Sequence, residues 1–221
     1  MAAALHTAEL GEIAPDETEI LRYAMLPRSA QDGADLPLDA CLAEIRGRIR
    51  CRAVWREFPL IRTEEGLDLG FAVTRSKDLG RRLSGCEAVL LFCCTAGTEM
   101  DRLITRATLR SPVHGLLMHA IGAQQVEGAC DALCAQLAAL FPEYTLSPRY
   151  SPGYGDLPLA LQRDVFAALD CERLIGVTLT DSLLMRPSKS VTAIIGMKKN
   201  NAPDTVSKRS ILLYRRRSLC V

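Results

Sequence analysis

The stretch RYSPGYGD, residues 149–156, gathers residue types that can hold a small polar ligand. The guanidinium of Arg149 is a planar fork of donors that matches a carboxylate. Tyr154 offers a flat ring face and a hydroxyl, and a turn through Pro152 and Gly153 exposes backbone N–H and C=O groups that can read the edge of a base. A turn alone needs only the proline and a glycine, so the arginine and the tyrosines indicate a ligand site.

Glu127 is the candidate partner for a positively charged group of such a ligand, because it lies on the flank of a long helix predicted from Ser111 to Pro142. A structural explanation of the same residues stays open. Arg149 could pair with Asp156, and the turn could simply redirect the chain, since surface pairs of this kind are common and weak. Residue types alone do not separate the two explanations.

Other catalytic patterns are missing from the sequence. His114 and His119 are five residues apart, which places them off the i, i+4 spacing of two zinc ligands on a helix. The sequence contains no HExxH, GxGxxG or GxSxG pattern, and no lysine in the position that a phosphate-binding loop requires. No hydrolase, nucleotide or dinucleotide site is therefore indicated by a motif.

The nine cysteines favour reduced thiols in a core over disulfides or zinc, because their number is odd and no two-pair CxxC arrangement occurs. Cys93 and Cys94 lie inside an apolar run, where burial would raise a thiol pKa. A redox protein that uses these two thiols remains an alternative hypothesis. It predicts that both react rapidly in the native state.

The composition is that of a globular domain, with 221 residues, a hydrophobic fraction of 48% and a net charge of +1. This charge balance gives no field that would attract nucleic acid or an anionic membrane. The longest apolar run, Ala88–Cys94, is far shorter than a membrane span, and the acidic residues near the N-terminus do not fit an export signal. We therefore expect a cytoplasmic protein without membrane or nucleic-acid partners.

The apolar periodicity predicts an α+β fold, a single domain with a central, mostly antiparallel sheet flanked by helices. Helices are expected at 17–23, 38–50, 76–83, 112–141 and 159–169, strands at 52–62, 68–74, 88–94 and 190–195. The domain is expected to span residues 38–197, after a helical N-terminal extension (1–37) and before a basic, frayed tail (198–221). The start of the chain, including His6, is expected to be disordered.

Two segments resemble the activation domain of vitamin B12-dependent methionine synthase. The first is RYSPGYGD, which is similar to the family's Arg-x-x-Pro-Gly-Tyr turn, and the second is GVTLTDSLLMRPSKSVTAIIG at residues 176–196. Upstream, Glu127 and Asp131 are similar to paired acids on a helix of the family. The earlier part of the sequence resembles the small stand-alone form of this domain. Because the sequence has no recognisable module for cobalamin, homocysteine or methyltetrahydrofolate, we expect the chain to act on another polypeptide.

The resemblance implies a function and a set of site residues. The family's domain binds S-adenosylmethionine, and the resemblance places this ligand on Glu127, Arg149, Pro152, Gly153 and Tyr154. It implies a role in reductive reactivation of cobalamin, carried by a partner methionine synthase polypeptide, with an electron from a flavodoxin-like reductant. No catalytic acid or base is expected, because cofactor and methyl donor carry the chemistry. The alternative is a docking module that grips a corrinoid protein and no longer binds S-adenosylmethionine.

Overall fold

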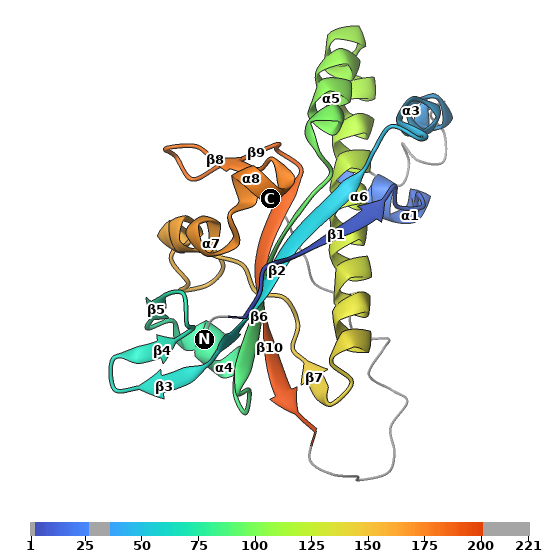
Figure 1. The fold of residues 1–221 in the computed structure, drawn as a ribbon. Helices are drawn as coiled ribbons and strands as arrows, with labels where there is room; N and C mark the ends of the chain where they lie inside the picture. Colours follow the sequence, from blue (N-terminus) through green and yellow to red (C-terminus); the bar gives the residue numbers. More distant parts are fainter. Residues whose placement is uncertain (1–2, 27–35, 201–221) are drawn as a thin grey trace.

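The computed structural model describes residues 3–26 and 36–200 of the chain. Its centre is a five-stranded antiparallel sheet with the strand order β1-β2-β6-β10-β7 (Figure 1). The strands are β1 (His6–Gly11), β2 (Cys51–Pro59), β3 (Ile61–Thr63), β4 (Gly66–Asp68), β5 (Val73–Thr74), β6 (Ala88–Thr95), β7 (Tyr144–Leu146), β8 (Thr178–Leu179), β9 (Met185–Arg186) and β10 (Ser190–Lys199). The helices are α1 (Glu17–Tyr23), α3 (Leu38–Ile45), α4 (Lys77–Arg82), α5 (Thr98–Arg110), α6 (Pro112–Leu140), α7 (Gln162–Leu169) and α8 (Cys171–Ile175), with a 3-10 turn at Leu159–Leu161. The expected α+β class is confirmed.

The central strand β6 is buried along its whole length, because helices or loops cover both faces of the sheet. Alternate residues point to opposite sides. Phe92 and Cys94 belong to the core beneath α6, whereas Leu91 and Cys93 belong to a second core beneath α4, α7 and α8. We refer to these sides as the α6 face and the α7 face, and Figure 1 shows the helices on their two sides of the sheet.

The long helix α6 forms as the sequence predicts. Ser111 caps its N-terminus by accepting a hydrogen bond from the His114 N–H, and Pro112 occupies the first turn. The sequence did not predict α5, which packs against α6. Gly115 permits this packing, since a Cβ there would lie 3.0 Å from the Cα of Thr108 on α5.

The N-terminal segment differs from the expectation. The residues around His6 were expected to be disordered, but they form the edge strand β1, and the His6 ring stacks on Trp55 of β2 at a centroid distance of 4.2 Å. The following helix α1 has the predicted bounds, and its Ile20 is fully buried in the α6-face core. The first described residues therefore share the core with the rest of the chain.

Several other boundaries move. The helix expected at 38–50 ends at Ile45, and the strand expected at 52–62 divides into β2 and β3. A hairpin joins β3 to β4, and the last strand, which was expected to end at residue 195, continues to Lys199. That strand includes Lys198 and Lys199, which were assigned to the tail, whereas residues 201–221 of the predicted tail lie outside the described residues.

In the described part of the chain, no helix combines the length and the apolar composition that a membrane crossing requires.

Candidate functional site

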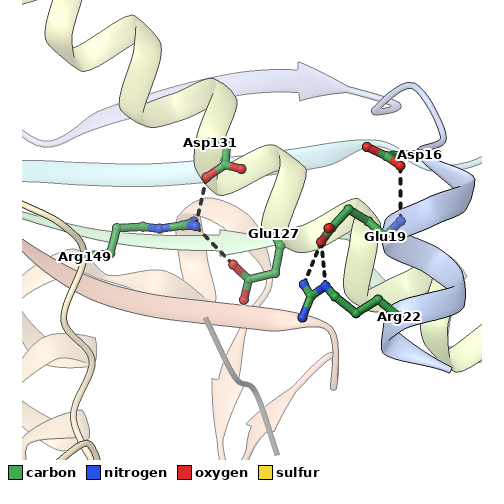
Figure 2. Close-up of polar contacts among 6 residues, drawn as sticks. All are labelled: Asp16, Glu19, Arg22, Glu127, Asp131 and Arg149. Carbon is green, nitrogen blue, oxygen red and sulfur yellow. Dashed lines mark hydrogen bonds and ion pairs between the residues drawn. The ribbon is translucent and has the colours of Figure 1, made fainter. Parts of the chain in front are cut away.

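Arg149 reaches the α6 face from the open edge of the sheet. After β7, the chain continues along β10, where Ser147 N–H donates to the carbonyl of Gly196 and Tyr150 exchanges two backbone hydrogen bonds with Ile194. From this edge the Arg149 side chain extends to α6. Its Nη2 donates to Glu127 Oε2 at 3.2 Å and to Asp131 Oδ1 at 2.9 Å (Figure 2). The paired acids of the sequence motif therefore meet the arginine of the turn motif.

This ion pair is largely removed from water. The side chain of Arg149 is 13% exposed and that of Glu127 is 11% exposed, whereas Asp131 is 57% exposed. Burial alone would lower the pKa of Arg149, but the neighbouring acidic groups, Cys130 and Glu127 foremost, raise it above its ordinary value. Burial also raises the pKa of Cys130, so its thiol is neutral and we assign the stabilising charge to the carboxylates.

One donor of the guanidinium is unsatisfied. Arg149 Nη1 is buried and has no hydrogen-bond partner among the described residues. A buried donor without an acceptor costs about 1–3 kcal/mol, and an anionic acceptor at this position would remove that cost. The site therefore has the chemistry to take a carboxylate.

A cavity of about 320 Å³ lies next to Glu127, between α1, α6 and the segment that leads into β10. Its walls combine apolar side chains with Tyr23, His119 and Lys189, and Glu127 supplies its acidic group. Burial, with the charge of Lys189 second, lowers the pKa of His119 below its ordinary value. A volume of this size is at the lower end of ligand sites in proteins.

The turn that follows Arg149 lies on the other face of the sheet. Tyr150 is 6% exposed in the α7-face core, and its hydroxyl donates to the carbonyl of Tyr154 at 3.0 Å. Gly153 has φ +94°, a conformation that favours glycine, and its N–H donates to the carbonyl of Leu157. Pro152 is buried and Tyr154 is 40% exposed. The five predicted site residues thus divide into Arg149 with Glu127 on one side and Pro152, Gly153 and Tyr154 on the other.

The structural alternative predicted that Arg149 pairs with Asp156, and this pairing is wrong, because Arg149 pairs with Glu127 and Asp131. The Asp156 carboxylate instead accepts from the Ser76 hydroxyl, from the Lys77 N–H at 2.7 Å and from the Asp78 N–H at 3.2 Å. The hydrogen bond from Ser76, followed by those from the backbone, lowers the pKa of Asp156. The end of the RYSPGYGD stretch is therefore fastened to the N-terminus of α4.

The thiols are buried on both faces. All eight cysteines among the described residues are free and buried, and burial raises the pKa of Cys94. The pKa of Cys93 is also raised, first by its hydrogen bond with Cys171 and then by burial. Within residues 3–26 and 36–200, no group of three or more histidine, cysteine or acidic side chains is arranged to hold a metal ion.

Sequence reasoning missed two features of the site. Asp131 was recognised as part of the acidic pair but was not placed on Arg149, because the contact joins segments 18 residues apart across the sheet edge. Tyr23 was missed because it belongs to the segment treated as an extension. No spacing signal connects Tyr23 to Glu127, since their proximity depends on how α1 packs on α6.

Comparison with known proteins agrees with this fold and these motifs. Residues 135–208 match the family model described as vitamin B12 dependent methionine synthase, activation domain. The structure is similar to the crystal structure of the MetH reactivation domain bound to AdoHcy, with a TM-score of 0.63 and 17% identity over 90% of this chain and 80% of that chain. No curated protein gives a significant match.

The chain thus has the α+β fold of a methionine synthase reactivation domain. The resemblance of its sequence to the activation domain of vitamin B12-dependent methionine synthase is confirmed, and the matched residues include the Arg149 turn.

Proposed function

We propose that the chain is an S-adenosylmethionine-binding subunit that supports reductive remethylation of cobalamin in a cobalamin-dependent methionine synthase or a related corrinoid methyltransferase. Two findings support this proposal. The family model covers the segment that contains the Arg149 turn, and a protein of the same fold has been crystallised with AdoHcy, the demethylated form of S-adenosylmethionine.

The observation that carries the proposal is the buried ion pair of Arg149 and Glu127 beside a cavity that Glu127 lines. Arg149 has one buried donor without an acceptor among the described residues, and a methionyl carboxylate would supply that acceptor. Glu127 would then hold the ligand ammonium. The residues of this pair fit the two charged groups of an amino acid.

The turn at Pro152, Gly153 and Tyr154 would take the nucleoside end of the ligand. An elongated molecule that joins an amino acid to a nucleoside can contact both Arg149 and the following residues around the sheet edge. Tyr154 is partly exposed and offers a ring face, while the turn offers backbone groups for the base. These assignments give each of the five residues predicted from the sequence a role.

When bound, S-adenosylmethionine would supply a methyl group to a cobalamin that a partner polypeptide carries. The cobalamin would also receive one electron from a reductant such as a flavodoxin. This chain contributes binding, orientation and exclusion of water. Arg149 and Glu127 fix the amino acid end, so that the sulfonium methyl is held in one position. No residue needs to move a proton, since the difficult chemistry belongs to the cofactor and the methyl donor.

Calorimetric titration of S-adenosylmethionine into the purified chain tests the proposal. We expect a dissociation constant near micromolar, which corresponds to about 8 kcal/mol of binding free energy. Arg149→Ala should weaken binding by about a hundredfold or more, since it removes the carboxylate partner. Arg173→Ala is the matched control, because this arginine is 69% exposed and pairs only with Asp170 among the described contacts of its side chain.

One observation favours a second function. Arg149 already has two carboxylate partners, so the pair could hold the fold without any ligand. The chain would then be a docking module for a corrinoid protein that does not bind S-adenosylmethionine. Absence of binding heat in the wild type, together with co-migration with a corrinoid methyltransferase, would select this function over the first.

A further inference from the structure

The cavity beside Glu127 has one wall from the N-terminal segment of the chain. Tyr23, the last residue of α1, lines this cavity together with Glu127, Val126 and Val191. Among the described residues that precede α3, Tyr23 alone lines the cavity. The site therefore depends on where α1 is held.

Two buried glutamines of α6 hold the segment that precedes α1. Gln125 accepts from the Ile13 N–H at 2.9 Å and donates to the Ile13 carbonyl at 2.6 Å, and Gln124 donates to the Ala14 carbonyl at 3.1 Å. Gly128 lets Ile13 approach the helix, since a Cβ at that glycine would lie 2.6 Å from Ile13 Cγ2. We call these contacts the glutamine clamp. They fix the chain two residues before Asp16, the N-cap of α1.

The ring of Tyr23 contacts Arg22, and the charge of Glu127 affects the pKa of its hydroxyl. The Arg22 guanidinium lies 4.4 Å from the centre of the Tyr23 ring, and Glu19 pairs with Arg22 at 2.6 Å (Figure 2). Burial, followed by the negative charge of Glu127, raises the pKa of Tyr23 to about 12. The phenol is therefore neutral at physiological pH, and Tyr23 itself adds no charge to the cavity wall.

We propose that Tyr23 is a further binding residue of the ligand site, whose side chain forms a wall against the aliphatic part of the amino acid that Glu127 and Arg149 hold. This inference rests on the proposed function, because it concerns the same site. The glutamine clamp makes α1 a permanent part of that site, so the wall is present before the ligand arrives. A preformed wall lowers the ordering cost of binding.

Calorimetry on two Tyr23 variants tests the role of the ring. Tyr23→Ala should weaken S-adenosylmethionine binding by about tenfold, equivalent to about 1.4 kcal/mol. Tyr23→Phe keeps the ring and should stay within about threefold of the wild type. Thr18→Ala is the matched control, since this residue is exposed on the same helix and does not line the cavity.

A second readout follows the Tyr23 side chain in the wild-type sequence and uses the Tyr23→Phe variant only to assign its resonance. The chain has five tyrosines, so labelling with 3-fluorotyrosine gives a ¹⁹F spectrum in which Tyr23→Phe assigns one resonance. Addition of S-adenosylmethionine should shift the Tyr23 resonance. If the wild type binds but the Tyr23 resonance does not shift, or if Tyr23→Ala binds with full affinity, the role of Tyr23 is wrong and the proposed function stands. Absence of binding heat in the wild type would overturn both.

Discussion

The two faces of the sheet use polar residues in different ways, although both receive side chains from the same eight-residue stretch. On the α6 face, Arg149 forms a buried pair with Glu127 beside a cavity. On the α7 face, Tyr150 packs into the core and Asp156 caps the exposed N-terminus of α4. Among the described residues, the first arrangement leaves Arg149 Nη1 buried without an acceptor, whereas in the second the Asp156 carboxylate accepts hydrogen bonds from the start of α4.

This difference teaches that a compact sequence motif can perform two tasks. Arg149 and Tyr150 are neighbours in the chain, but the pairing of Tyr150 with Ile194 on the sheet edge sends their side chains to opposite faces. The turn then anchors the edge segment to α4 through Asp156, which fixes the backbone position of Arg149. Mutations can therefore test the anchoring of the turn to α4 separately from the ion pair of Arg149.

The largest effect on stability should come from the α6 face. Arg149→Met should lower the free energy of unfolding by about 3–4 kcal/mol, because it removes the guanidinium that pairs with the buried Glu127 carboxylate. Urea unfolding measures this loss. The double variant Arg149→Met/Glu127→Gln should recover at least about 1 kcal/mol relative to the sum of the single changes. Simple additivity would contradict the buried pair, and Arg173→Met should stay within about 0.5 kcal/mol of the wild type.

A smaller effect should come from the glutamine clamp on the same face. Gln125→Ala removes both side-chain partners of the Ile13 backbone and should cost about 1–2 kcal/mol. The Ile13 amide should also exchange its hydrogen faster than in the wild type, which NMR can follow. Gln124→Ala removes the hydrogen bond to Ala14 and the one that Gln124 accepts from Gln125, but leaves both bonds to Ile13, so this graded comparison should cost less. Equal stability of wild type and Gln125→Ala would show that α1 is held by other contacts.

The smallest effect on stability should come from Asp156 on the α7 face, and its dependence on pH distinguishes it from the other effects. The pKa of Asp156 is lower in the folded chain than its ordinary value of 3.8, so its contribution to stability is complete above that value and is lost as the pH falls through the folded pKa. Asp156→Ala should therefore lower the melting temperature slightly at pH 7, with a difference that narrows towards pH 3. Asp181→Ala, at an exposed loop position, provides the control. A constant difference across this range would contradict the capping role of the carboxylate.

Much of the fold follows from local sequence signals. Ser111 with Pro112 and the apolar run at Ala88–Cys94 predict α6 and β6 because capping and strand burial are properties of short segments. The helix α5 was missed although Met100, Leu103 and Ile104 carry its apolar spacing, so that signal was present and overlooked. Strand β1 was missed for a different reason. Its pairing partner β2 begins 40 residues after Gly11, so the pairing depends on tertiary contact and not on a local pattern.

The candidate site was predictable in its residue types and not in its arrangement. The residue types alone predict that Arg149 takes a carboxylate, that Glu127 takes a positively charged group and that the turn takes the edge of a base. The contact with Asp131 and the separation of the turn from the ion pair depend on the path of the chain along β10. The position of Tyr23 depends on the packing of α1 against α6, for which the sequence holds no spacing rule.

By itself, the sequence determined the α+β class, the long capped helix, the buried central strand and the resemblance to a methionine synthase activation domain, because these depend on local patterns and motifs. The tertiary structure alone decided that Arg149 pairs with Glu127 and Asp131 while Asp156 caps α4. It also decided that Tyr23 completes the cavity. The physical reason is that alternate residues of an extended chain face opposite sides of a sheet, so neighbours in sequence are separated and distant segments meet.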